Sequence, residues 1–294
     1  MGVQRVVGLV GLGLVGQALG RRLRAQGWRT IGYDTCPEAR DAFATAGGEA
    51  ADDLRTIGRS CDEVVLAVFD TRGVIDVLES DDGLLAAAHR VAGVIDCSTG
   101  APDELEQLAG RLRARGIDFI ESPLSGSSEQ IGAGEAVALL GGEGEAISRH
   151  ADLISSLATQ RIHVGAAGAG ARAKLATNLV LGLNRAVLAE GMAFAQALGI
   201  EPALFLQLVL STPARSAAAA VKGPLMVARD FAPRSRVRQH LKDVELMLAA
   251  AKQAGIGLPF SEIHARLMRE GVAAGEGDLD NAAILLRLLK NPDA

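Results

Sequence analysis

A lysine and an asparagine stand four positions apart at the end of the glycine-rich stretch 165–178, which reads GAAGAGARAKLATN. Residues at i and i+4 of a helix lie above one another, so Lys174 and Asn178 would point from the same face. An ammonium group and a carboxamide placed in this way can transfer a proton and orient a polar substrate. The alternative is an exposed, solvated pair. The flanking positions are mainly leucine, alanine and valine, however, and this pattern predicts a buried helix that is apolar nearly all round.

A second constellation is Gly11-Leu12-Gly13-Leu14-Val15-Gly16, which follows a short β-branched run at 5–10 and precedes a helical pattern at 17–26. This order of strand, glycine turn and helix is typical of a dinucleotide-binding unit. The first glycine makes the turn, the second lets the backbone approach a pyrophosphate, and the third lets helix and strand pack closely. The free N–H groups and the dipole at the helix N-terminus favour the phosphates.

Asp34 continues the same unit, because it ends a second predicted strand at 30–33. A carboxylate at this spacing accepts hydrogen bonds from the adenosine ribose and repels a 2′-phosphate. We therefore expect NAD as the cofactor, with NADP less favoured, although Arg40 lies downstream and would soften this preference. The alternative is that the glycines serve only tight packing and that Asp34 caps a helix.

Short strands and helices continue to alternate through the first half of the chain. Strands are predicted at 63–69, 91–97, 118–121, 137–140 and 161–164, and helices at 103–115 and 143–157. This alternation predicts a Rossmann-type, largely parallel sheet covered by helices on both faces. In such a sheet ligands bind beyond the carboxyl ends of the strands. Phe69 and Thr99 fall at such ends and are predicted to meet the cofactor, although each could be part of an ordinary polar turn.

The loop that contains Ser125, Gly126 and Ser127 follows a predicted strand and is rich in small residues. Such loops let backbone N–H groups and hydroxyls converge on an anion. A substrate carboxylate is the candidate anion, so we expect the loop to bind a small carboxylic acid. A flexible surface loop is the alternative.

The second half of the chain changes character, and no strand is predicted after Gly170. A helical pattern runs through 171–198, and further helices are predicted at 202–211, 216–228, 236–254, 259–274 and 281–290. We therefore predict an α/β chain of two domains: a dinucleotide-binding domain at 1–164, followed by an all-α domain for substrate binding and oligomerisation at 165–294. The many leucine and alanine positions on the helices favour a homo-oligomer, either a dimer or a tetramer.

The composition narrows the class of protein. Of the 294 residues, 49% are hydrophobic and 22% charged, which suits a globular chain with a packed core. The net charge of −5 and an aromatic content of 3% disfavour nucleic-acid binding. The longest apolar run, at 6–16, is too short to cross a membrane. The 3 cysteines have no C-x-x-C spacing and favour a cytoplasmic protein with reduced thiols, while the 5 scattered histidines predict no metal site.

Four motifs coincide in order, and together they resemble those of the β-hydroxyacid dehydrogenase family, which includes 3-hydroxyisobutyrate dehydrogenase and tartronate semialdehyde (2-hydroxy-3-oxopropionate) reductase. The motifs are the glycine loop at 11–16, D-x-S-T-x-x-P at 96–102, the substrate loop at 121–127, and G-x-x-G-x-G-x-x-x-K-x-x-x-N at 165–178. Lys242-Asp243 is similar to the family's K-D pair, and the segment 275–280 to its terminal glycine and aspartate segment. The longer 6-phosphogluconate dehydrogenases carry a histidine where Thr177 stands here.

Four positions depart from the family pattern. Val15 stands for a methionine, Glu121-Ser122 for Asp-Ala before a proline, and Ser127 for a glycine. Ser127 adds a side chain where the backbone would meet the substrate, so we expect a narrower pocket or an extra hydroxyl contact.

The resemblance implies hydride transfer between a nicotinamide cofactor and a small 3-hydroxy carboxylic acid or its semialdehyde. Loss of a hydride leaves a developing carbonyl, so a base must take the hydroxyl proton, and Lys174 is the candidate. By the same resemblance Asn178 would orient the substrate, and Lys242 would contact the cofactor. Two alternatives are a cofactor-binding sensor that has lost its chemistry and an imine reductase-like enzyme, a class that typically lacks this lysine.

Overall fold

The computed structural model describes residues 5–86 and 88–289, and its contacts divide the chain into two compact units. The first unit ends at Lys174 and the second begins at Leu175. This division falls inside the long helix α9 (Ala169–Ala197), whereas the predicted boundary between residues 164 and 165 precedes that helix.

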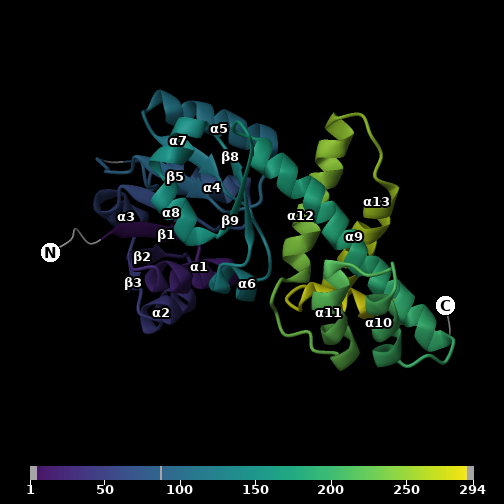
Figure 1. Cartoon of the computed structure of the whole chain (residues 1–294). Coiled ribbons are helices and arrows are strands. Elements are labelled where there is room, and N and C mark those ends of the chain that lie inside the picture. Colours follow the sequence, from purple (N-terminus) through teal and green to yellow (C-terminus); the bar gives the residue numbers. More distant parts are fainter. Residues whose placement is uncertain (1–4, 87, 290–294) are drawn as a thin grey trace. The chain divides into compact units, whose positions relative to one another are not determined.

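A nine-stranded, largely parallel sheet organises the first unit (Figure 1). Its strands are β1 (Val6–Val10), β2 (Arg29–Tyr33), β3 (Glu49–Ala50), β4 (Glu63–Leu66), β5 (Gly93–Asp96), β6 (Asp118–Glu121), β7 (Leu124–Ser125), β8 (Val137–Gly141) and β9 (Gln160–Gly165). The spatial order is β3-β2-β1-β4-β5-β6-β8-β7, and β9 pairs with β8. The strands from β3 to β6 are parallel, while β8 is antiparallel to both β6 and β7. The predicted Rossmann-type sheet is confirmed.

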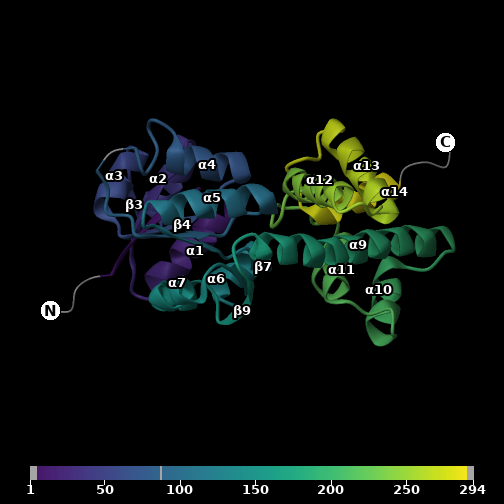
Figure 2. The same cartoon turned by 90° about the horizontal axis from the view of Figure 1, so that it is seen from above.

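Helices cover both faces of this sheet. They are α1 (Leu14–Ala25), α2 (Pro37–Thr45), α3 (Leu54–Ser60), α4 (Thr71–Glu79), α5 (Pro102–Ala114), α6 (Ser128–Ala133), α7 (Gly144–Arg149) and α8 (Ala151–Leu157). Figure 2 shows α4 and α5 on one side of the strands and α1, α6 and α7 on the other. Successive strand residues point to opposite faces. Val64 and Val94 accordingly pack in one buried cluster with α3, α4 and α5, and Val65 and Ile95 in another with α1 and α8.

Several element boundaries differ from the predicted ones. The strands expected at 63–69 and 91–97 are shorter, since β4 ends at Leu66 and β5 spans only Gly93–Asp96. The residues that follow these strands belong instead to the loops that carry polar side chains. Helices α2, α3, α4 and α6 were not predicted, because none of them exceeds nine residues and a short helix shows little periodicity.

The single helix predicted at 143–157 is wrong, because the chain breaks at His150 into α7 and α8. The imidazole of His150 turns inward, where Nδ1 lies 2.6 Å from Glu63 Oε1 and Nε2 lies 3.1 Å from Asp118 Oδ2. A Cβ at Gly93 would collide with this ring, so only a glycine at position 93 leaves room for the imidazole of His150. His150 therefore ties the break between the helices to the first residues of β4 and β6.

We expect this tie to make the stability of the first unit depend on pH. The hydrogen bond to Glu63 raises the pKa of His150. The stabilisation is therefore full below the unfolded-state pKa of histidine and is lost as pH rises through the raised folded-state pKa. His150→Gln should lower the free energy of unfolding by about 1.5 kcal/mol near pH 6, and by less near pH 9. Denaturant titration checks this, with exposed His163→Gln as the control; an equal loss at both pH values would contradict it.

The second unit is entirely helical among the described residues. Beyond α9 it contains α10 (Pro202–Ser211), α11 (Ala217–Ala228), α12 (Val237–Gln253), α13 (Pro259–Ala273), the 3₁₀ turn η1 (Asn281–Ile284) and α14 (Leu285–Leu288). The helix predicted at 281–290 is thus a 3₁₀ turn followed by a short helix, and residue 290 lies outside the described part of the chain. No helix in the described ranges is long and apolar enough to cross a membrane.

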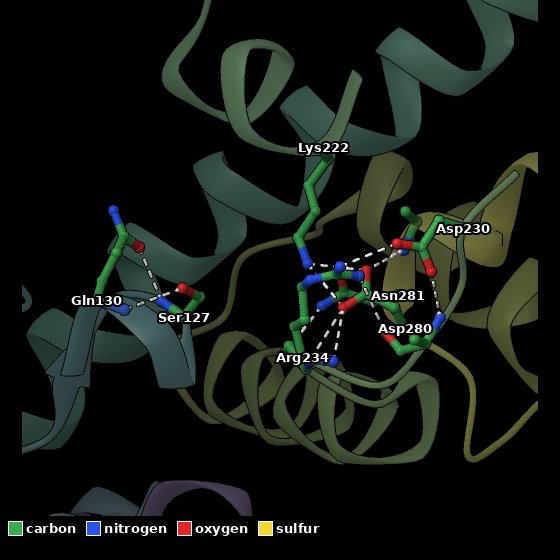
Figure 3. Close-up of polar contacts among 10 residues, drawn as sticks. Ser127, Gln130, Lys222, Asp230, Arg234, Asp280 and Asn281 are labelled. Carbon is green, nitrogen blue, oxygen red and sulfur yellow. Dashed lines mark hydrogen bonds and ion pairs between the residues drawn. The ribbon is translucent and has the colours of Figure 1, made fainter. Parts of the chain in front are cut away.

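A buried ion pair organises the end of this second unit (Figure 3). Lys222 Nζ lies 2.8 Å from both carboxylate oxygens of Asp280, a residue that is fully buried. The backbone N–H groups of Arg234 and Ser235 also donate to this carboxylate, at 3.2 and 3.0 Å. The terminal glycine and aspartate segment seen in the sequence therefore contributes a structural charge to the helical core.

Candidate active site

The parallel strands bring most of the predicted cofactor residues to one edge of the sheet. β1, β2, β4 and β5 run in the same direction. Their carboxyl ends lead into Gly11, Asp34, Phe69 and Thr99, respectively. Ligands of open α/β sheets bind beyond this edge.

The glycines of the loop 11–16 serve different purposes. Gly11 has a φ of +89°, and a Cβ there would collide with the backbone of Ala67. A Cβ at Gly16 would collide with the carbonyl of Gly11, so the third glycine is required for close packing. Gly13 faces open space: among the described residues, its two chain neighbours aside, no atom lies within 4 Å of its Cβ position. The loop therefore leaves room for a pyrophosphate at its middle glycine.

Helix α1 starts at Leu14, earlier than the predicted residue 17, with Gly13 as its N-cap. Gly13 has no side chain, and among the residues that the structure describes none caps this helix, so the N–H groups of the first turn have no capping partner there. Unpaired N–H groups and a positive helix dipole beside an open backbone are the features that bind a phosphate. The residues present thus fit a dinucleotide.

The carboxylate of Asp34 lies directly against this loop. Its Oδ2 accepts a hydrogen bond from the N–H of Leu12 at 2.6 Å, and its Oδ1 accepts one from the N–H of Cys36 at 2.8 Å. The N-cap residue of α2 is Cys36, not Asp34. Arg40 lies at the same corner, where its Nη1 donates to the backbone oxygen of Asp34 at 2.6 Å. A carboxylate and a guanidinium therefore stand together beside the loop.

Phe69 and Thr99 lie in the two loops that follow β4 and β5. The side chain of Phe69 is 48% exposed. The two loops are joined because Ser98 Oγ accepts a hydrogen bond from the N–H of Val68 at 3.0 Å. The loop that contains Phe69 is thus tied to the loop after β5 at this edge of the sheet.

Lys174 is buried, with 7% of its surface exposed, and lies in the second turn of α9. Its Nζ donates to the backbone oxygen of Leu124 at 2.6 Å. Leu124 immediately precedes the predicted substrate loop, so the structure brings the ammonium group to the start of that loop. Asn178, which is also buried, follows one turn later on the same helix.

The predicted substrate loop connects β7 to α6. Ser125 ends β7, Gly126 is exposed, and a Cβ at Gly126 would lie 2.9 Å from the Cβ of Ala136. Ser127 is the N-cap of α6 and forms a reciprocal capping box with Gln130 (Figure 3). In this box Ser127 Oγ accepts from the N–H of Gln130 at 3.3 Å, and Gln130 Oε1 accepts from the N–H of Ser127 at 2.8 Å. The hydroxyl oxygen of Ser127 therefore has a structural role as the N-cap of α6, in addition to any contact with substrate.

Two substitutions separate these uses of Ser127. Glycine is an acceptable N-cap, so Ser127→Gly should change the free energy of unfolding by only a few tenths of a kcal/mol, whereas Ser127→Ala should lower it by about 1 kcal/mol. If the side chain also contacts substrate, Ser127→Gly should change KM or the ranking of substrates while the Kd for NAD stays the same. Steady-state kinetics with several hydroxy acids checks this. An unchanged substrate profile would leave Ser127 with the capping role alone.

Within the second unit, Asp243 joins two of the predicted site residues. Its Oδ2 accepts a hydrogen bond from Asn178 Nδ2 at 3.2 Å, and its Oδ1 lies 3.0 Å from Lys242 Nζ. Asp243 is itself buried. The K-D pair found in the sequence thus orients the carboxamide of Asn178 as well as the lysine.

In the sequence, Glu121 stands out only as a departure from the family pattern. The structure places its buried carboxylate against the N-terminus of α9, where it accepts hydrogen bonds from the N–H groups of Gly168 and Ala171. The signal available in the sequence was a carboxylate at the end of a strand that precedes a glycine-rich helix start. That signal identifies a helix cap only when the two segments are known to meet.

These features define the class of an NAD(P)-linked oxidoreductase: a dinucleotide-binding sheet edge, together with a lysine and an asparagine on the helix that follows. Residues 6–165 match the NAD binding domain of 6-phosphogluconate dehydrogenase, and residues 168–289 match the NAD-binding domain of NADP-dependent 3-hydroxyisobutyrate dehydrogenase. The chain belongs to the β-hydroxyacid dehydrogenase family.

Individual relatives are similar over nearly the whole chain. L-threonate dehydrogenase of Cupriavidus necator is 28% identical over 96% of both chains, and 2-hydroxy-3-oxopropionate reductase of Escherichia coli is 27% identical over 97% of this chain and 98% of its own. A crystal structure of 3-hydroxyisobutyrate dehydrogenase from Salmonella typhimurium is 27% identical, with a TM-score of 0.86 over 96% of this chain and 99% of its own. An imine reductase from a Pseudomonas species shares the fold at 22% identity, with a TM-score of 0.65 over 97% of this chain and 100% of its own.

Proposed function

We propose that this protein interconverts a small 3-hydroxy carboxylic acid and the corresponding semialdehyde or oxo acid, with Lys174 as the general acid/base. The observation that carries the proposal is the burial of Lys174 with its Nζ at the start of the loop 125–127. Relatives that act on small hydroxy acids support the substrate class.

The nicotinamide, when bound, accepts or supplies the hydride. In the oxidative direction Lys174 Nζ takes the hydroxyl proton of the substrate, and in the reductive direction its ammonium form returns that proton. Ser125, Gly126 and Ser127 hold the substrate carboxylate through hydroxyls and the backbone N–H of Gly126, because the N–H of Ser127 is bonded to Gln130. Asn178, oriented by Asp243, places the substrate hydroxyl. Lys242, held by the same aspartate, is the proposed cation for the cofactor.

Residues of the first unit would bind the cofactor. The loop 11–16 and the start of α1 would receive the pyrophosphate, Asp34 would bind the adenosine ribose, and Phe69 and Thr99 would line the edge beyond β4 and β5. The carboxylate of Asp34 favours NAD, because it would repel the 2′-phosphate of NADP.

Apolar side chains on α9 support a homo-oligomer, either a dimer or a tetramer. Val180, Val187 and Phe194 are 57%, 65% and 66% exposed and recur every seven residues, so they form one stripe on the helix. Leu198, 63% exposed, continues this stripe by one turn. An apolar stripe of this kind favours contact with a second copy of the chain. The free thiols of Cys36, Cys61 and Cys97 support a cytoplasmic protein.

A panel of substrates tests the proposed activity. Purified protein should reduce NAD in the presence of at least one small 3-hydroxy acid, with L-threonate, 3-hydroxyisobutyrate and glycerate as the first three, and absorbance of the reduced nicotinamide reports turnover. A cyclic imine with NADPH belongs in the same panel. Turnover of the imine alone would favour the imine reductase reading, and cofactor binding without any turnover would favour a sensor.

A further inference from the structure

The N-terminus of α9 is held by a side chain from a distant part of the first unit. Glu121, the last residue of β6, has 1% of its surface exposed. Its Oε1 accepts a hydrogen bond from the N–H of Ala171 at 2.8 Å, and its Oε2 accepts one from the N–H of Gly168. The first N–H groups of a helix lack partners within the helix, and a carboxylate satisfies both their hydrogen bonds and the helix dipole.

Glycines provide the space for this carboxylate. Gly141 is the cross-strand partner of Glu121, and a Cβ at Gly141 would lie 2.6 Å from Glu121 Oε2. A Cβ at Gly170 would lie 2.9 Å from the Cβ of Glu121. Gly168 has a φ of +85°, which turns its N–H toward the carboxylate at little steric cost. Gly168 and Gly170, in the glycine-rich stretch 165–178, thus make room for the contact between Glu121 and the start of α9.

The same short segment of chain holds Lys174. Leu124 follows Glu121 by three residues, and its backbone oxygen accepts the hydrogen bond from Lys174 Nζ. The segment 121–124 therefore makes two contacts with α9. Glu121 binds N–H groups at the start of the helix, and Leu124 binds the side chain of Lys174. Movement of either contact would shift the ammonium group relative to the loop that begins at Ser125.

We propose that Glu121 is a positioning residue for the reaction: by anchoring the start of α9, it sets the distance and direction of Lys174 Nζ toward the substrate. This inference rests on the proposed role of Lys174 as the general acid/base. A glutamate is suited to the task because its two oxygens each accept one N–H group. Glutamine has the same shape but only one acceptor oxygen, so its amide nitrogen would face a second donor.

A double-mutant cycle tests the proposal. Glu121→Gln should lower kcat about tenfold, because a small displacement of a catalytic group has a large effect on rate, while the Kd for NAD stays the same. In the Lys174→Ala background, Glu121→Gln should leave the residual kcat unchanged, because the group that it positions is absent. Glu121→Asp, which keeps two oxygens, should restore part of the rate.

Asp53→Asn provides a matched control. Asp53 also caps a helix of the first unit, since its carboxylate accepts from the N–H of Thr56 at 2.7 Å, but α3 carries no proposed site residue. This variant should keep the kcat of the native protein. Thermal unfolding of all variants shows whether they are folded, and if Glu121→Gln is not, the cycle is run with Glu121→Asp.

The outcomes separate the two proposals. Native kcat in Glu121→Gln, or an equal fractional loss with and without Lys174, would overturn the positioning role of Glu121. Native kcat in Lys174→Ala would instead overturn the proposed acid/base, whatever Glu121 does. A loss of kcat in Glu121→Gln that disappears in the Lys174→Ala background supports both.

Discussion

Replacement of Lys174 by alanine should lower kcat by about 10² to 10⁴, the usual contribution of a positioned acid/base. The Kd for NAD should stay near the native value, because the proposed dinucleotide site, formed by the loop 11–16 and Asp34, does not include this side chain. The fold should also survive, since the substitution removes a buried amine whose burial is itself unfavourable, although the carbonyl of Leu124 loses this donor. Single-turnover kinetics and a cofactor titration measure the two quantities.

Two further variants make the Lys174 result specific. Lys252 is exposed in the last turn of α12, and Lys252→Ala should leave kcat unchanged. Asn178→Ala should have a smaller effect than Lys174→Ala, because a carboxamide orients the substrate without exchanging a proton, although misplacement can still lower kcat by up to about 10²-fold. Full turnover in Lys174→Ala on a proven substrate would show that this lysine is structural and would make Lys242 the next candidate.

The native protein should use NAD with a higher kcat/KM than NADP, and Asp34→Ser should lower kcat/KM with NAD by about 10- to 100-fold. Loss of hydrogen bonds to a charged group corresponds to about 1.5–3 kcal/mol, and each 1.4 kcal/mol is about tenfold. The same substitution removes the repulsion toward a 2′-phosphate, so kcat/KM with NADP should rise relative to NAD. Steady-state kinetics with both cofactors gives the ratio.

Arg40 and the charge of Asp34 can be examined separately. Asp34→Asn removes the charge but keeps one acceptor oxygen, which can still bond the N–H of Leu12 while the amide nitrogen faces the N–H of Cys36, so it should relieve the repulsion of NADP. The Arg40 guanidinium already lies beside Asp34, and the double variant Asp34→Ser, Arg40→Ser should lose the gain with NADP. Equal or better use of NADP by the native protein would refute the assigned role of Asp34.

Much of the fold could be predicted because its signals are local. The glycine loop, the strand before it and Asp34 lie within one βαβ segment, and apolar periodicity identified α5 and α9 close to their observed ends. The short helices were missed because they show little periodicity, whereas the merged pair α7 and α8 depends on a long-range contact. His150 interrupts a helical pattern because its imidazole binds Glu63 and Asp118, and sequence spacing carries no information on that contact.

The same distinction holds for the candidate site. Residue types and spacing determined the dinucleotide loop, the carboxylate at position 34 and the Lys174–Asn178 pair, since each of these depends on neighbours a few residues apart on one strand, turn or helix. The capping box of Ser127 and Gln130 is local as well, since its two residues are three positions apart, although it was not predicted. Only the tertiary structure decided that Asp243 orients Asn178 and that Glu121 anchors the start of α9. The hydrogen bonds to Asn178 and α9 join residues about fifty or more positions apart. The packing of the chain decides which groups form these hydrogen bonds, because a buried carboxylate or amide needs a partner and can bind only a donor or acceptor that the fold places beside it.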